Sequence, residues 1–96
     1  MRKSVKRNKY ERLPDAMIDL HGLYVAEAQT EFQLFLHDSL QNNYRSIKVI
    51  TGKGLHSADG VSKIKEMVID ILSAHGLKHR PAKLNDGGEG ALIVDL

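Results

Sequence analysis

The spacing of two apolar runs constrains this chain more than any other feature of its sequence. Residues 16–20 (AMIDL) and 46–51 (SIKVIT) have the length and apolar character of strands. Between them, apolar residues recur every three or four positions, as on one face of an amphipathic helix. That stripe comprises Val25, Ala28, Phe32, Phe35, Leu36 and Leu40. Because a crossover of this length joins parallel strands, the sequence predicts a βαβ unit.

The second half of the chain predicts another helix and a hairpin. Apolar residues in 64–72 share a helical face, and Gly76 follows where a left-handed backbone often ends a helix. Residues 77–84 mix polar and apolar types, residues 85–90 (NDGGEG) are typical of a turn, and residues 91–96 (ALIVDL) resemble a strand. The order β, α, β, α, β, β predicts an α/β two-layer sandwich. We expect a mixed four-stranded sheet with both helices on one face and the other face partly open.

Length and composition exclude several classes of protein. A chain of 96 residues is about the size of one small domain. It has no cysteine, which excludes disulfides, thiolate zinc sites and a thiol nucleophile. No apolar run approaches the roughly 20 residues that span a bilayer, and the basic N-terminus lacks the apolar segment of a signal peptide. We therefore expect a cytoplasmic protein, or a nuclear one in a eukaryote, without a membrane partner.

The charge of the chain is concentrated at its start. We expect residues 1–14 to form a basic flexible tail and residues 15–96 to form the folded domain. Residues 1–12 hold six basic residues and one acid, a net charge of +5, so the other 84 residues carry −3. Such a tail gains affinity for phosphates by releasing condensed counterions. The alternative is a terminus that only aids solubility.

Polar residues at the end of the first strand are candidates for chemistry. Because side chains alternate along a strand, Met17, Asp19 and His21 share one side. Ligand sites of βαβ units form beyond the carboxyl ends of the strands, so Asp19 and His21 should approach residues 51–54. Asp19 can orient a histidine or bind a divalent cation, and His21 can transfer a proton near neutral pH. The alternative is that both residues only satisfy backbone groups.

The loop after the second strand has features of a phosphate site. Gly52 and Gly54 allow a backbone path close to a ligand, Lys53 adds positive charge, and the next helix directs its N-terminal amides here. His56 and Ser57 are further candidates for substrate contact. The spacing is not that of a Walker A loop, so nucleotide hydrolysis is not indicated. The alternative is an ordinary turn, with Ser57 as a helix-entry residue.

A second basic cluster lies at Lys78, His79, Arg80 and Lys83. On an edge strand, alternate residues of this cluster would face solvent, and Lys78 and Arg80 are then accessory contacts for phosphates. Charges on an edge strand also prevent edge-to-edge pairing, which is the alternative explanation.

Two motifs resemble those of the Smr (small MutS-related) domain family. Residues 18–22 (IDLHG) resemble its L-D-L-H-G signature, with Ile in place of the first Leu, and residues 51–54 (TGKG) resemble its T-G-x-G or H-G-x-G motif. Residues 27–28 look like the E-A pair that opens the first helix of the family. Residues 90–96 are similar to its closing glycine and strand. The resemblance covers about residues 16–96.

This resemblance implies a fold similar to the C-terminal domain of translation initiation factor three, and an endonuclease that cuts DNA or RNA. It implies Asp19 and His21 as catalytic residues. The expected contacts to nucleic acid or phosphate are Gly22, Thr51, Gly52, Lys53, Gly54, His56 and Ser57.

Two chemistries and two other functions stay open at this point. If a ribose 2′-hydroxyl attacks, His21 is its base and no metal is needed. If water attacks, Asp19 holds Mg²⁺ or Mn²⁺. No small-molecule cofactor is expected. The alternative functions are a non-catalytic DNA- or RNA-binding module and a protein-interaction domain.

Overall fold

Two helices and four strands make up the described part of the chain, which comprises residues 13–52, 63–82 and 90–96 of a computed structural model. The elements are β1 (Ala16–Asp19), α1 (Val25–Gln41), β2 (Ser46–Ile50), α2 (Lys63–Ala74), β3 (Lys78–Pro81) and β4 (Ala91–Asp95). Their order is the predicted one. Neither helix is long and apolar enough to cross a membrane, within these described residues.

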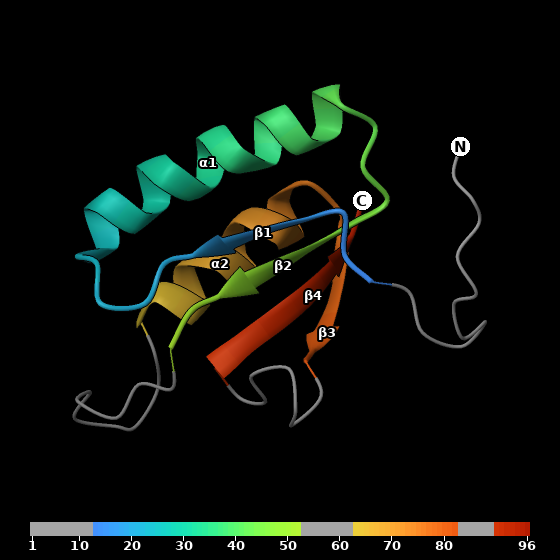
Figure 1. Cartoon of the computed structure of the whole chain (residues 1–96). Helices are drawn as coiled ribbons and strands as arrows, with labels where there is room; N and C mark the ends of the chain where they lie inside the picture. Colours follow the sequence, from blue (N-terminus) through green and yellow to red (C-terminus); the bar gives the residue numbers. More distant parts are fainter. Residues whose placement is uncertain (1–12, 53–62, 83–89) are drawn as a thin grey trace.

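The four strands form one mixed sheet in the order β1-β2-β4-β3 (Figure 1). β1 pairs in parallel with β2, which confirms the predicted βαβ unit. β4 pairs antiparallel with both β2 and β3, and the β3–β4 pairing is the predicted hairpin. The last strand of the chain therefore lies inside the sheet, and β1 and β3 are its edges.

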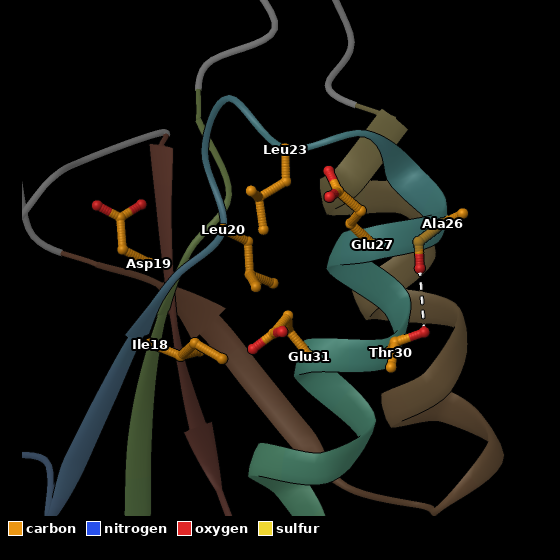
Figure 2. Close-up of a pocket in the computed structure, with 8 residues that line it drawn as sticks. All are labelled: Ile18, Asp19, Leu20, Leu23, Ala26, Glu27, Thr30 and Glu31. Carbon is orange, nitrogen blue, oxygen red and sulfur yellow. Dashed lines mark hydrogen bonds between the residues drawn. The ribbon is translucent and has the colours of Figure 1, made fainter.

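Both helices cover the same face of the sheet (Figures 1 and 2). The core lies between these two layers. It includes Phe32 and Leu36 of α1, Val68 and Leu72 of α2, and Ile47, Val49, Leu92 and Val94 of the sheet. This arrangement confirms the predicted two-layer α/β sandwich.

The residues that flank the helices explain where each one starts or ends, and the predicted end of the second helix at Gly76 is confirmed. The backbone N–H of Tyr24, just before α1, donates to the Glu27 carboxylate at 3.4 Å, which satisfies one amide at the helix start. α1 ends at Asn42 and Asn43, and Asn43 has φ 59°. α2 ends before Gly76, with φ 69°, a left-handed conformation that glycine adopts without steric cost.

Candidate active site

Asp19 and His21 form a hydrogen-bonded pair at the exit of β1. Asp19 is the last residue of β1, and His21 lies in the turn that follows. The Nδ1 atom of His21 is 2.5 Å from Oδ1 of Asp19, and the backbone N–H of His21 donates to the same oxygen at 3.0 Å. The side chain of His21 is 65% exposed and that of Asp19 is 49% exposed. The carboxylate therefore fixes the imidazole ring while solvent still reaches it.

The electrostatics of this pair set the role that each atom can take. The hydrogen bond to the His21 side chain lowers the pKa of Asp19 below its ordinary value of 3.8, and it outweighs the opposing effect of burial. A carboxylate at Nδ1 favours the tautomer that carries its proton there. Among the described residues nothing bonds Nε2 of His21. That nitrogen is therefore available to accept or donate a proton.

The exit of β2 lies beside this pair, as the motif positions predict. The backbone N–H of Leu20 donates to the carbonyl of Ile50 at 2.7 Å, which joins the two strand ends. Gly52 has φ +87°, and a Cβ atom built there would lie 3.4 Å from Cβ of His21. The absence of a side chain at Gly52 therefore leaves room for His21.

Thr51 is buried and shapes the loop from inside. Its hydroxyl donates to the carbonyls of Gly52 at 3.3 Å and Gly90 at 3.4 Å. The backbone amides of Thr51 and Gly52 also donate to the Gly90 carbonyl, at 2.8 and 3.1 Å. With a side chain only 2% exposed, Thr51 holds the loop and does not present its hydroxyl to a ligand.

The role of Gly90 was not predicted, because its carbonyl acts 39 residues away from Thr51. Asp15 is a second anchor that the sequence analysis missed. Its Oδ2 accepts the backbone N–H groups of Arg45 at 2.7 Å and Ser46 at 3.4 Å, which ties the start of β1 to the start of β2. Neither residue stands in a local pattern that would indicate a partner so far along the chain.

The other predicted site residues fall into three groups. Gly22 lies in the exposed turn after β1, with φ +82°. The predicted contacts Lys53, Gly54, His56 and Ser57 lie outside the described residues. Lys78 and Arg80 lie on β3, at the opposite edge of the sheet from β1. Three strand spacings separate those edges, roughly 14 Å.

A cavity of about 580 Å³ lies between β1 and α1 (Figure 2). It is lined by Ile18, Asp19, Leu20, Leu23, Ala26, Glu27, Thr30 and Glu31. Figure 2 shows Glu27 and Glu31 projecting from α1 toward the strand, whereas the Asp19 carboxylate points away from α1. Because two carboxylates repel a phosphate, this cavity is not suited to the backbone of a nucleic acid. The open side of Asp19 is the side available to such a substrate.

Asp19 is the residue at this edge that could hold a divalent cation. Within the described residues, no three His, Cys, Asp or Glu side chains form a metal-binding group. Oδ1 of Asp19 is bonded to His21, and none of the described residues donates to Oδ2. Mg²⁺ is often held by one or two carboxylates together with substrate phosphates. The donor set thus fits an ion shared with substrate, and not one enclosed by the protein.

The sequence profile of the Smr domain matches residues 18–96. The chain is 38% identical over 79 residues to Endonuclease NBR9 of Saccharomyces cerevisiae, which covers 82% of this chain and 32% of that protein. The chain thus spans about a third of that relative's length.

Two solved structures have the same fold. The human small-MutS related domain superposes with a TM-score of 0.65 at 34% identity, over 82% of this chain and 98% of that one. The Smr domain of Thermus thermophilus MutS2 gives a TM-score of 0.71 at 24% identity, over 84% and 96% of the two chains. The second likeness is one of fold alone.

Proposed function

Because the chain belongs to the Smr domain family, a family of nucleic-acid-binding and nuclease domains, we propose that it is an endonuclease that cuts the phosphodiester backbone of nucleic acid. One observation carries the proposal most directly. An exposed histidine is fixed by a carboxylate through Nδ1 and keeps Nε2 open, at the strand edge where two motifs meet. Yeast NBR9, the relative described above, is named an endonuclease.

In this proposal His21 transfers the proton that phosphodiester cleavage requires. Its Nε2 accepts a proton from the attacking hydroxyl or water, or donates one to the leaving oxygen. Asp19 holds the ring in the required tautomer and stabilises its protonated form. Positioned acid–base groups of this kind typically contribute about 10² to 10⁴ in rate.

The phosphate is held by the two turns next to His21. Gly22 and Gly52 bring backbone close to the site, exposed at Gly22 and partly buried at Gly52. We propose Lys53, Gly54, His56 and Ser57 as further contacts. Lys78 and Arg80 are accessory contacts, at the far edge of the sheet. Thr51 supports the loop from within.

The nucleophile is either a ribose 2′-hydroxyl or water. With the 2′-hydroxyl, DNA is not cut and Asp19 serves only His21. With water, Oδ2 of Asp19 would hold Mg²⁺ or Mn²⁺, which supplies electrostatic stabilisation of the phosphate when bound. The hydrogen bond between Oδ1 of Asp19 and His21 is compatible with either nucleophile.

The test is cleavage of end-labelled single-stranded RNA and of supercoiled plasmid by the full chain, each with Mg²⁺, Mn²⁺ or EDTA. His21→Ala should lose at least about 100-fold in rate. His37→Ala is the matched control, because His37 is an exposed histidine on α1 away from the strand ends. Activity that survives EDTA on RNA alone would identify the 2′-hydroxyl as nucleophile.

Full activity in both Asp19→Ala and His21→Ala would refute the proposal. Binding of nucleic acid without turnover in any of these metal conditions would instead favour the alternative of a non-catalytic binding module. Neither result depends on which nucleic acid is the natural substrate, since both types are present in the assay.

A further inference from the structure

The sheet has one face that no described element covers. α1 and α2 both lie on the opposite side, and Asp19 points away from them (Figure 2). We call the uncovered side the open face. The strand register places on it Met17 and Asp19 of β1, Ser46, Lys48 and Ile50 of β2, Ala91, Ile93 and Asp95 of β4, and Lys78 and Arg80 of β3, of which Ser46 and Ala91 are buried. Met17 is 58% exposed.

The strand register arranges the open face in rows that cross the sheet. Met17 is opposite Lys48, Lys48 is opposite Ile93, and Ile93 is opposite Arg80. Because alternate residues of a strand are roughly 7 Å apart, this row lies one step from the row that contains Asp19. The open face therefore continues directly into the candidate active site.

The charges of the open face are not all equivalent. Arg80 donates to both carboxylate oxygens of Asp95, at 3.2 and 3.1 Å, so these two charges compensate each other. Lys48 lies in the middle of the sheet, is half-buried and has no ion pair with any described residue. A cation held among apolar side chains without a partner favours an incoming anion.

Apolar side chains surround this cation and restrict what the anion can belong to. Met17, which is exposed, and Ile50 and Ile93, which are partly buried, are the apolar neighbours of Lys48 on this face. A double helix turns its phosphates outward and keeps its base faces stacked inside, so it cannot place base faces on such a surface. An unpaired strand can put its phosphates on a cation and its bases or riboses on apolar side chains.

We infer that the open face binds an unpaired segment of nucleic acid, with a phosphate at Lys48 and base or sugar faces on Met17 and Ile93, and leads this strand to Asp19 and His21. The inference rests on the proposed function for the direction of the strand, but the binding surface is separate from the cleavage chemistry. It makes Lys48 and Met17 binding residues that lie in neither of the two motifs.

The test measures binding of a fluorescein-labelled single-stranded 12-mer and of the same sequence as a duplex, by anisotropy, over a range of salt concentrations. The full chain should prefer the single strand. Lys48→Gln should weaken that binding about 5- to 10-fold at low salt and reduce the slope of log K against log salt by about 0.7, the contribution of one phosphate contact. Lys48→Arg should restore most of the affinity and most of the salt dependence.

Matched controls separate this surface from general effects of charge and apolarity. Arg45→Gln removes the same charge just before the start of β2, outside the row, and should change binding by less than about twofold. Met17→Ser should weaken binding about threefold. Leu34→Ser should leave binding unchanged, because Leu34 lies on α1, where its side chain is 61% exposed. Circular dichroism of each variant establishes that it is folded.

The inference is overturned if Lys48→Gln binds the single strand as the original chain does, or if the duplex is preferred. If Lys48→Gln weakens binding but the unmodified chain never cuts, the proposed function fails and the binding surface stands. If cleavage depends on His21 while Lys48→Gln and Met17→Ser leave binding unchanged, the proposed function stands and the binding surface on the open face is refuted.

Discussion

At the scale of single residues, the room behind His21 depends on one glycine. A methyl group at Gly52 would lie 3.4 Å from Cβ of His21, and φ +87° is strained for any residue with a side chain. We therefore expect Gly52→Ala to lower the free energy of unfolding by about 1 kcal/mol or more and to displace the imidazole. Thermal unfolding and the cleavage assay would measure these two effects.

Gly22→Ala is the matched control for that substitution. Gly22 has nearly the same φ, +82°, but a Cβ there meets nothing within 4 Å. Both variants should lose similar stability, whereas cleavage should fall much further in Gly52→Ala. Equal loss of cleavage in the two would contradict the idea that Gly52 acts by leaving space for His21.

The hydrogen bond between Asp19 and His21 predicts a measurable titration. Because the imidazole donates to the ionised carboxylate, the pKa of Asp19 is lowered, and the native state binds this proton less readily than the unfolded chain. The stabilisation is thus complete above pH 3.8 and is lost as the pH falls through the lowered value. Carboxyl NMR should give a midpoint below 3.8, which rises toward 3.8 in His21→Ala; an unchanged midpoint would exclude the bond in solution.

The pairing of Asp19 with His21 could be predicted because it is local. Alternation along a strand puts residues two apart on one side, and the carboxyl ends of parallel strands meet at one edge. The inward position of Thr51 could not be predicted in the same way. It depends on the carbonyl of Gly90, and turn residues of this kind do not specify a distant partner.

At the scale of elements, α1 is held mainly by the residues that face the sheet. Phe32 is fully buried, whereas Leu34, two residues later, is 61% exposed. Phe32→Ala should lower the free energy of unfolding by about 3 to 5 kcal/mol, because it removes buried surface and leaves a cavity. Leu34→Ala should change it by less than about 0.5 kcal/mol. Urea denaturation of both variants measures these changes. Similar losses of unfolding free energy in the two would show that the buried face of α1 is assigned wrongly.

The elements themselves were predicted well, because each depends on short-range periodicity. The predicted apolar stripe of α1 extends too far at both ends, because Val25 and Leu40 are each 39% exposed. The sequence patterns did not predict the order of the strands in the sheet. β4 lies between β2 and β3, and this position depends on pairing with β2, far earlier in the chain, which no local periodicity records.

At the scale of the whole molecule, the charges divide into two parts of opposite sign. Residues 1–12 carry +5, and the other 84 residues carry −3. A protein of this kind approaches a polyanion chiefly through its basic segment, while a site such as that of Asp19 and His21 acts at short range. Affinity for nucleic acid and the rate of cutting should therefore be separable.

Deletion of residues 1–12 tests this separation. Binding of a single-stranded oligonucleotide should weaken about 10-fold or more at low salt, with a shallower dependence on salt, because fewer counterions are released. The cleavage rate at saturating protein should stay within about twofold, since Asp19 and His21 are unchanged. A variant with six Lys→Gln and Arg→Gln changes in residues 1–12 keeps the length and isolates the charge. If both variants bind as the full chain does, these residues serve solubility only, and the affinity resides in the folded domain.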